Sequence, residues 1–127
     1  MIRDIFIIGV IIMSVILGHV IIQNKLKIDS AQIVSALEDL KVKIENDGKE
    51  NLQQKVDDVN NIWKQKMESW AIIVDHGEID SIEKAMINVK SAIDANEDEQ
   101  IVTQIDEAIF WVEHIEEKEK INLKNIF

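Results

Sequence analysis

The chain has 127 residues and a formal net charge of −10, with 24 acidic residues against 14 Lys and Arg. An acidic surface repels the phosphate backbone of nucleic acids, so nucleic-acid binding is not expected. The absence of Cys excludes disulfide bonds, thiolate nucleophiles and zinc sites built from cysteines, and the absence of Pro permits long uninterrupted helices.

The first predicted element is an apolar stretch from Ile5 to Ile22 that contains no charged side chain. As a helix, its 18 residues would measure roughly 27 Å, close to the hydrocarbon thickness of a bilayer. The stretch is longer than the apolar core of a cleaved signal peptide, and no small-residue cleavage site follows it. The sequence therefore predicts a retained membrane anchor over residues 1–28, with the span at residues 5–22.

Two features of the sequence give opposite indications of the orientation of this anchor. Lys25 and Lys27 after the span outnumber Arg3 before it, and this count favours a cytoplasmic C-terminal side. A four-residue N-terminal tail followed by an acidic domain is typical of an exported domain. We expect a single-pass protein of the cell membrane whose soluble domain lies outside the cytoplasm.

Beyond the anchor, apolar residues recur every three or four positions in four blocks, each of which would form one stripe along a helix. No block alternates with a period of two, so strands are not expected. The blocks run from Ile33 to Ile44, from Leu52 to Val74, from Ile79 to Ile93 and from Ile101 to Ile115. They predict helices near 30–46, 49–75, 81–95 and 97–119.

Capping patterns precede each block. In each, an Asp or Asn is followed three residues later by Glu or Gln, which is typical of a capping box at a helix N-terminus. Gly48 and Gly77 are predicted to close the first and second helices. The four predicted capping pairs are Asp29/Gln32, Asp47/Glu50, Asp80/Glu83 and Asn96/Glu99.

The short connections between these blocks favour antiparallel packing of successive helices. We therefore predict an all-α fold: an N-terminal transmembrane helix, an antiparallel bundle of four helices over residues 29–120, and an apolar C-terminal tail over residues 121–127. If the anchor continues into the first helix, the helix lengths at about 1.5 Å per residue predict where each connection lies. Both the turn that contains His76 and the end of the last helix are then expected near the membrane. Asp29 could instead mark a break between them.

One cluster of ionisable residues is a candidate site. The turn after the second block contains His76, Glu78 and Asp80. Counting the same rise of about 1.5 Å per residue along the last helix puts His114 at the same level. Imidazoles with carboxylates can hold a transition metal or titrate near neutral pH. No tight ligand spacing supports a metal, so the simpler interpretation is that His76 caps the second helix, Asp80 caps the third and His114 is a surface residue.

Three tryptophans, Trp63, Trp70 and Trp111, lie on the predicted helix stripes, where aromatic side chains are usually core. An exposed groove that binds a partner is the alternative.

Other candidate contacts lie at the two ends of the chain. His19 lies in the last turn of the span and is a candidate for a proton path or partner contact. The tail ending in Ile126 and Phe127 would fold back on the bundle or contact the membrane or a partner.

A resemblance covers nearly the whole chain. The segment Trp70-Ala-Ile-Ile-Val-Asp-His-Gly-Glu-Ile-Asp80 and the ending Asn-Ile-Phe127 resemble domain-of-unknown-function family 4363, small membrane-anchored proteins of spore-forming Gram-positive bacteria. The resemblance implies no activity or site residue. It implies an outward-facing domain with an accessory role beside a multi-pass membrane protein.

No serine, lysine or carboxylate of the chain lies in a recognisable catalytic setting, and no cofactor is expected. The sequence therefore predicts a non-enzymatic membrane protein that contacts the bilayer and either a membrane-protein partner or itself. The alternative is an extracytoplasmic sensor that binds a cation or a proton at the His76/His114 end.

Overall fold

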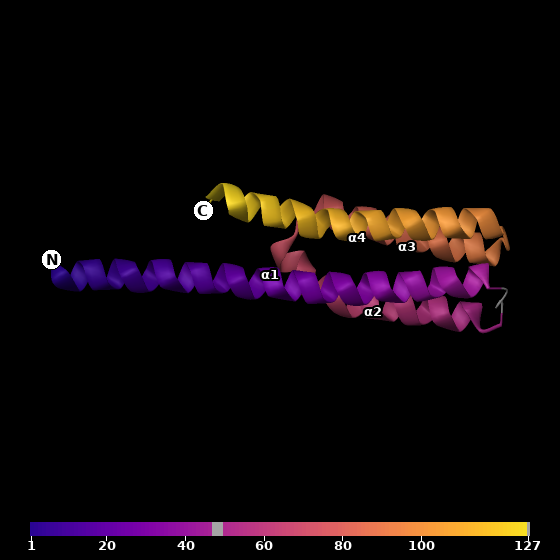
Figure 1. The fold of residues 1–127 in the computed structure, drawn as a ribbon, viewed down its shortest axis with the longest axis horizontal. Coiled ribbons are helices and arrows are strands. Elements are labelled where there is room, and N and C mark those ends of the chain that lie inside the picture. The colour runs from indigo at the N-terminus through magenta and orange to yellow at the C-terminus, as the bar shows by residue number, and fades with distance from the viewer. Residues whose placement is uncertain (47–49, 127) are drawn as a thin grey trace.

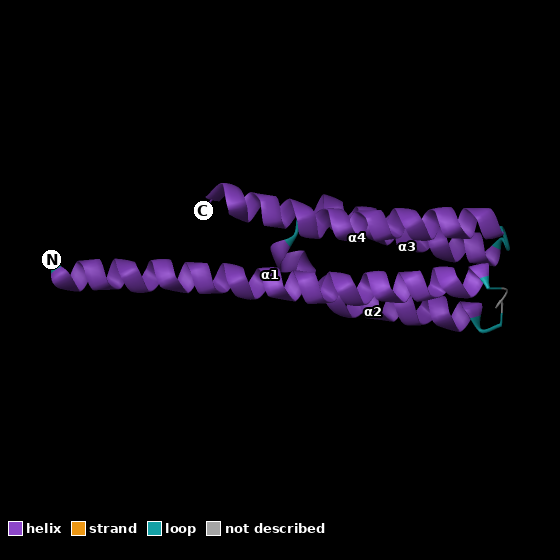
Figure 2. Ribbon diagram, viewed as in Figure 1, coloured by secondary structure: helices purple, strands orange, loops and turns teal. Residues whose placement is uncertain are grey.

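The computed structural model describes residues 1–46 and 50–126, and the side chains of this part through Ile121. The described part folds into four helices: α1 (Ile2–Glu45), α2 (Leu52–Ile73), α3 (His76–Asp94) and α4 (Asp98–Ile126). Figure 2 shows short connections between helices and no strand among these residues. The all-α bundle predicted from the sequence is confirmed.

Helix α1 joins the apolar stretch and the first bundle helix without interruption (Figure 1). The predicted boundary at residues 28 and 29 is therefore not a structural break, and Asp29 is not a helix cap but an interior residue of α1. With no Pro and no Gly between Gly18 and Gly48, nothing in the backbone interrupts the helix. The apolar stretch and the four-helix bundle thus share α1.

The second half of α1 is one of the four helices of the bundle. Each helix packs on the next, and α4 closes the ring by packing on α1. The core is a continuous cluster of buried aliphatic side chains around Trp63 and Trp70. The stripes predicted from the sequence supply this core, because residues three and four apart share one helix face.

The helix ends show where the two halves of the molecule meet. In Figure 1 the α2–α3 connection lies beside the middle of α1, and the C-terminal end of α4 lies beside the apolar half of α1. The α1–α2 connection lies at the opposite end of the bundle. We call the end that carries the α2–α3 connection the span-proximal end of the bundle.

Helix α3 begins five residues earlier than predicted. Its N-cap is Asp75, whose side chain accepts a hydrogen bond from the backbone N–H of Gly77. Asp80 is therefore not a cap, and Gly77 lies in the first turn of α3 rather than after the end of α2. His76 starts α3, so it does not cap α2, which ends at Ile73.

Helix α3 ends in a Schellman motif. Asn96 has a positive φ of 60°, its N–H donates to the carbonyl of Ile93, and the N–H of Glu97 donates to the carbonyl of Ala92. Asn96 therefore closes α3, whereas the sequence predicts it as the cap of the next helix. Asn is one of the few residues with a Cβ that adopt this conformation readily.

Helix α4 runs through Ile126, so the segment predicted as a separate tail is helical at residues 121–126. The predictions for Asp47, Gly48 and Phe127 lie outside the described residues.

Candidate functional site at the span-proximal end

A carboxylate buried between α1 and α2 is the centre of the first polar cluster. Asp29 is only 4% exposed. It accepts a hydrogen bond from the indole Nε1–H of Trp70 at 3.1 Å and forms ion pairs with Lys25 at 3.2 Å and Lys66 at 3.3 Å. Both carboxylate oxygens are engaged, so the cluster is a closed network of donors around one acceptor group.

The chemistry of Asp29 follows from this network. Burial raises its pKa, but the hydrogen bond from Trp70 and the two lysines outweigh burial, so the pKa is lowered from its ordinary value. Asp29 is therefore ionised at neutral pH, and its oxygens are already taken. Such a carboxylate is a poor general base and a good link between two helices.

The position of Asp29 in the stripe explains its burial. Leu26, Ile33 and Leu37 are fully buried on the same face of α1, and Asp29 lies in phase with them. Sequence reasoning treated Asp29 as a helix start and missed the network. The available signal was an acidic residue at a core position of the stripe, which requires a buried partner.

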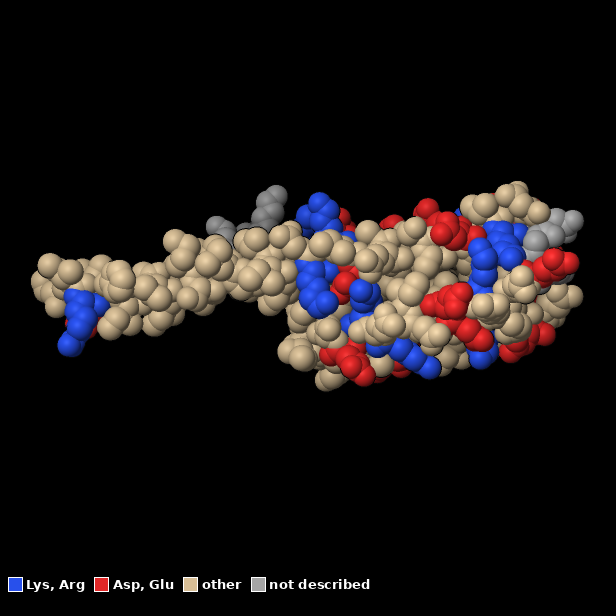
Figure 3. All heavy atoms as spheres, turned by 90° about the horizontal axis from the view of Figure 1, so that it is seen from below, with Lys and Arg blue, Asp and Glu red and all other residues tan. Residues whose placement is uncertain are grey.

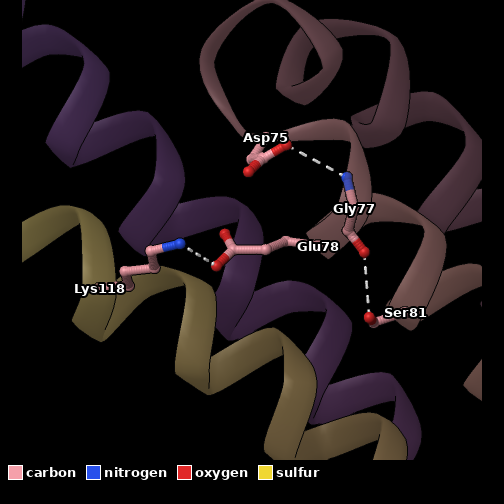
Figure 4. A network of polar contacts seen from close by, with 5 residues as sticks. All are labelled: Asp75, Gly77, Glu78, Ser81 and Lys118. Atoms are coloured by element: carbon pink, nitrogen blue, oxygen red, sulfur yellow. Dashed lines mark hydrogen bonds and ion pairs between the residues drawn. The ribbon is translucent and has the colours of Figure 1, made fainter.

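A second polar cluster joins α3 to α4 at the same end (Figure 4). The Nζ of Lys118 donates to Oε1 of Glu78 at 2.6 Å, and this contact raises the pKa of Lys118. The hydroxyl of Ser81 donates to the backbone carbonyl of Gly77, and the backbone N–H of Gly77 donates to the side chain of Asp75. The start of α3 is thereby fixed against the last turns of α4.

Glu119 lies beside this ion pair. Burial raises its pKa, and the negative charge of Glu78 raises it further, while Lys118 partly opposes the shift. Glu119 is thus a carboxyl whose ionised form is disfavoured in the folded bundle.

The two histidines of the predicted sensor site are both exposed. His114 on α4 stacks on the ring of Phe110, with centroids 5.7 Å apart and an interplanar angle of 15°, and it also contacts Trp111 edge to face. His76 starts α3. Among the described residues, no three His, Asp or Glu side chains are grouped to hold a metal ion.

The tryptophans occupy two environments. Trp63 and Trp70 are buried in the core, with their rings edge to face at 5.7 Å. Trp111 is half-buried against the core, and its neighbour Phe110 is exposed. His19 is half-buried on α1, and the side chain of Ile126 lies outside the described part of α4.

Two open grooves run between neighbouring helices. One of about 580 Å³ lies between α1 and α2 and is lined in part by Ile28, Ala31 and Ile62. The other, of about 340 Å³, lies between α2 and α3. Neither groove is lined by Asp29 or Glu119, the two carboxyls whose pKa values are displaced.

Comparison with known proteins agrees with this architecture of a helical bundle on a long apolar helix. The chain belongs to a family defined by a domain of unknown function, DUF4363, whose family model matches residues 20–126. The match includes the whole bundle and begins in the last turn of the apolar stretch. Searches of curated proteins and of solved structures gave no match.

Proposed function

We propose that this protein is a single-pass membrane protein without enzymatic activity, whose helical bundle serves as an accessory or interaction subunit for a membrane partner. The observation that carries the proposal is the apolar half of α1. An 18-residue window there has a mean hydropathy of 2.9, and none of it is buried inside the structure. One N-terminal helix is thus long and apolar enough to span a membrane.

The surface of this half supports insertion into lipid. Side chains such as Phe6, Ile12 and Leu17 are more than half exposed. Figure 3 shows the apolar half as a rod that carries charged residues only near its tip, whereas charged residues of both signs are scattered over the visible face of the bundle. A continuous apolar surface of this kind is unfavourable in water, and a bilayer would cover it completely.

The bundle itself supports a binding role rather than catalysis. Its buried carboxylate, Asp29, is saturated by three donors and lines neither of the two grooves. Exposed Phe110 and half-buried Trp111 offer aromatic side chains of the kind that dominate binding energies at interfaces. Anchoring in the same membrane would keep a partner, or a second copy of the chain, at a high effective concentration near the bundle.

Cross-linking in native membranes followed by mass spectrometry tests the interaction role. The proposal predicts cross-links from the lysines of the bundle to one recurring membrane protein or to a second copy. A Phe110→Ala variant should lose them if the aromatic surface binds the partner, while Ile87→Ala, an equally exposed change on α3, should keep them. Recovery of the protein only as an isolated monomer would contradict the proposal.

The same proposal places the bundle outside the cytoplasm. Because the chain has no Cys, a single Ile87→Cys variant gives one accessible thiol on the bundle. In intact cells, a membrane-impermeant maleimide should label this thiol without prior lysis. Labelling that appears only after lysis would place the bundle in the cytoplasm.

A further inference from the structure

The last turns of α4 extend beyond the rest of the bundle. The ion pair between Lys41 and Asp106, at 2.8 Å, sets the register of the antiparallel helices α1 and α4. Ile121 lies 15 residues beyond Asp106, so it is level with about residue 26 of α1, and Ile126 is level with about residue 21. The end of α4 therefore reaches the apolar span.

Burial along α1 agrees with this register. Gly18, His19, Ile22 and Gln23 lie on one face of the helix and are half-buried, whereas the surrounding residues of the span are exposed. Trp70 of α2 is hydrogen-bonded to Asp29 of α1, and α2 ends at Ile73. Because the two helices are antiparallel, α2 ends before it reaches the level of Ile22. The end of α4 is the element that runs beside this face (Figure 1).

The residues at this height suit the surface of a bilayer. Ile121 is an apolar side chain that is 55% exposed. Lys27 on α1 and Lys120 on α4 are exposed at the same level. Apolar side chains beside long cationic ones are typical of helices at the membrane interface, where the ammonium groups reach the lipid phosphates.

We infer that the end of α4, at Lys120 and Ile121, binds the lipid headgroup layer beside the span, so that the bundle contacts the membrane through both α1 and α4. The inference rests on the proposed anchoring by residues 5–22. Residue 26 is four residues past Ile22, or roughly 6 Å, and the headgroup layer on each side of a bilayer is about 5–7 Å thick. Ile121 then lies within this layer.

Site-specific fluorescence tests this contact with the full-length chain in vesicles of phosphatidylcholine and phosphatidylglycerol. Three single-cysteine variants carry an environment-sensitive nitrobenzoxadiazole probe: Ile121→Cys at the end of α4, Ile12→Cys in the span and Ile87→Cys on α3. All three positions are more than half exposed, so the labels should be tolerated, and circular dichroism checks the fold. Lipids with a nitroxide near the headgroup or deep in the acyl chain serve as quenchers.

The expected result is a several-fold loss of fluorescence at Ile121→Cys with the shallow quencher, a similar loss at Ile12→Cys with the deep quencher, and no loss at Ile87→Cys. If Ile121→Cys stays unquenched while Ile12→Cys is quenched, the contact of α4 with lipid is wrong and the anchor stands. If Ile12→Cys is also unquenched, the anchoring itself is wrong. A blue-shifted probe at Ile121→Cys that lipid nitroxides do not quench would mean that protein covers this site, which also overturns the inference.

Discussion

Asp29 joins α1 to α2 through donors from both helices, and removing its carboxylate leaves Lys66 and the indole of Trp70 without their acceptor. Asp29→Ala should therefore lower the free energy of unfolding by about 3 kcal/mol, the lower end of the range for a broken buried ion pair, because both lysines also reach water. Thermal unfolding followed by circular dichroism measures this. Asp39→Ala, an exposed change on the same helix, is the control and should have little effect.

The pH dependence of the same site has a defined sign. The folded pKa of Asp29 is lowered, so its stabilisation is present above the unfolded pKa of about 3.9 and is lost as the pH falls through the folded pKa. Asp29→Asn keeps an acceptor for Trp70 but loses the charge. The variant should be less stable than the wild type at pH 7, and the difference should shrink below about pH 4. A difference that is constant with pH would contradict ionisation of Asp29.

Glu119 should behave in the opposite way, because its folded pKa is raised. Its ionised form destabilises the bundle at neutral pH, and this cost disappears as the pH falls through the folded pKa toward the unfolded value of about 4.3. Glu119→Gln should raise the melting temperature at pH 7, because it removes the disfavoured charge, and should have little effect near pH 4. Glu117→Gln, at an exposed neighbour, is the matched control; a loss of stability in Glu119→Gln would refute the assignment.

Among the elements, the end of α3 depends on a left-handed residue. Asn96→Gly should be neutral or stabilising, because Gly adopts a positive φ without steric cost, whereas Asn96→Ala should cost about 1 kcal/mol, because Ala has a Cβ but lacks the short polar side chain that lets Asn adopt this φ. Asn61, an exposed interior position of α2, is the control. There the Gly variant should be less stable than the Ala variant by about 1 kcal/mol. Equal melting temperatures for the two Asn96 variants would contradict the Schellman motif.

The continuity of α1 is the second property at the scale of elements. Nitroxide labels on cysteines at Phe6 and Val42, both exposed, should give one narrow distance near about 54 Å, which is the length of a straight helix between them. Asn24→Pro should broaden and shorten this distribution by kinking α1, while Asn24→Ala should leave it unchanged. A broad distribution in the wild-type chain would mean that the anchor and the bundle move independently.

The elements also show what the sequence could predict. The spacing of apolar residues predicted the helices, and the short connections predicted their antiparallel packing. Spacing and connection length are both local properties of the sequence. The predicted N-caps were wrong at Asp29, Asp80 and Asn96, because an Asp or Asn followed by Glu or Gln three residues later also occurs inside helices and at their C-terminal ends. The partners of Asp29 are Lys25, Lys66 and Trp70, and a local pattern cannot show that Trp70, 41 residues away, provides the buried donor.

At the scale of the whole molecule, α1 gives the protein two unlike halves. One half exposes an apolar surface around its circumference as far as Leu17, and the other half lies in a bundle with its own core. The second polar cluster and the end of α4 lie where these halves meet. A membrane at this junction would hold the bundle at a fixed height, with the α1–α2 connection farthest from the lipid.

Anchoring by the apolar half of α1 is the central claim, and alkaline carbonate extraction of membranes tests it most directly. The full-length protein should remain in the pellet with integral membrane proteins, as should the bundle variant Ile87→Arg. The double variant Ile12→Arg/Val15→Arg should move to the supernatant, because each arginine at the centre of a span costs about 2.5–3.5 kcal/mol. Release of the wild-type protein into the supernatant would contradict the account.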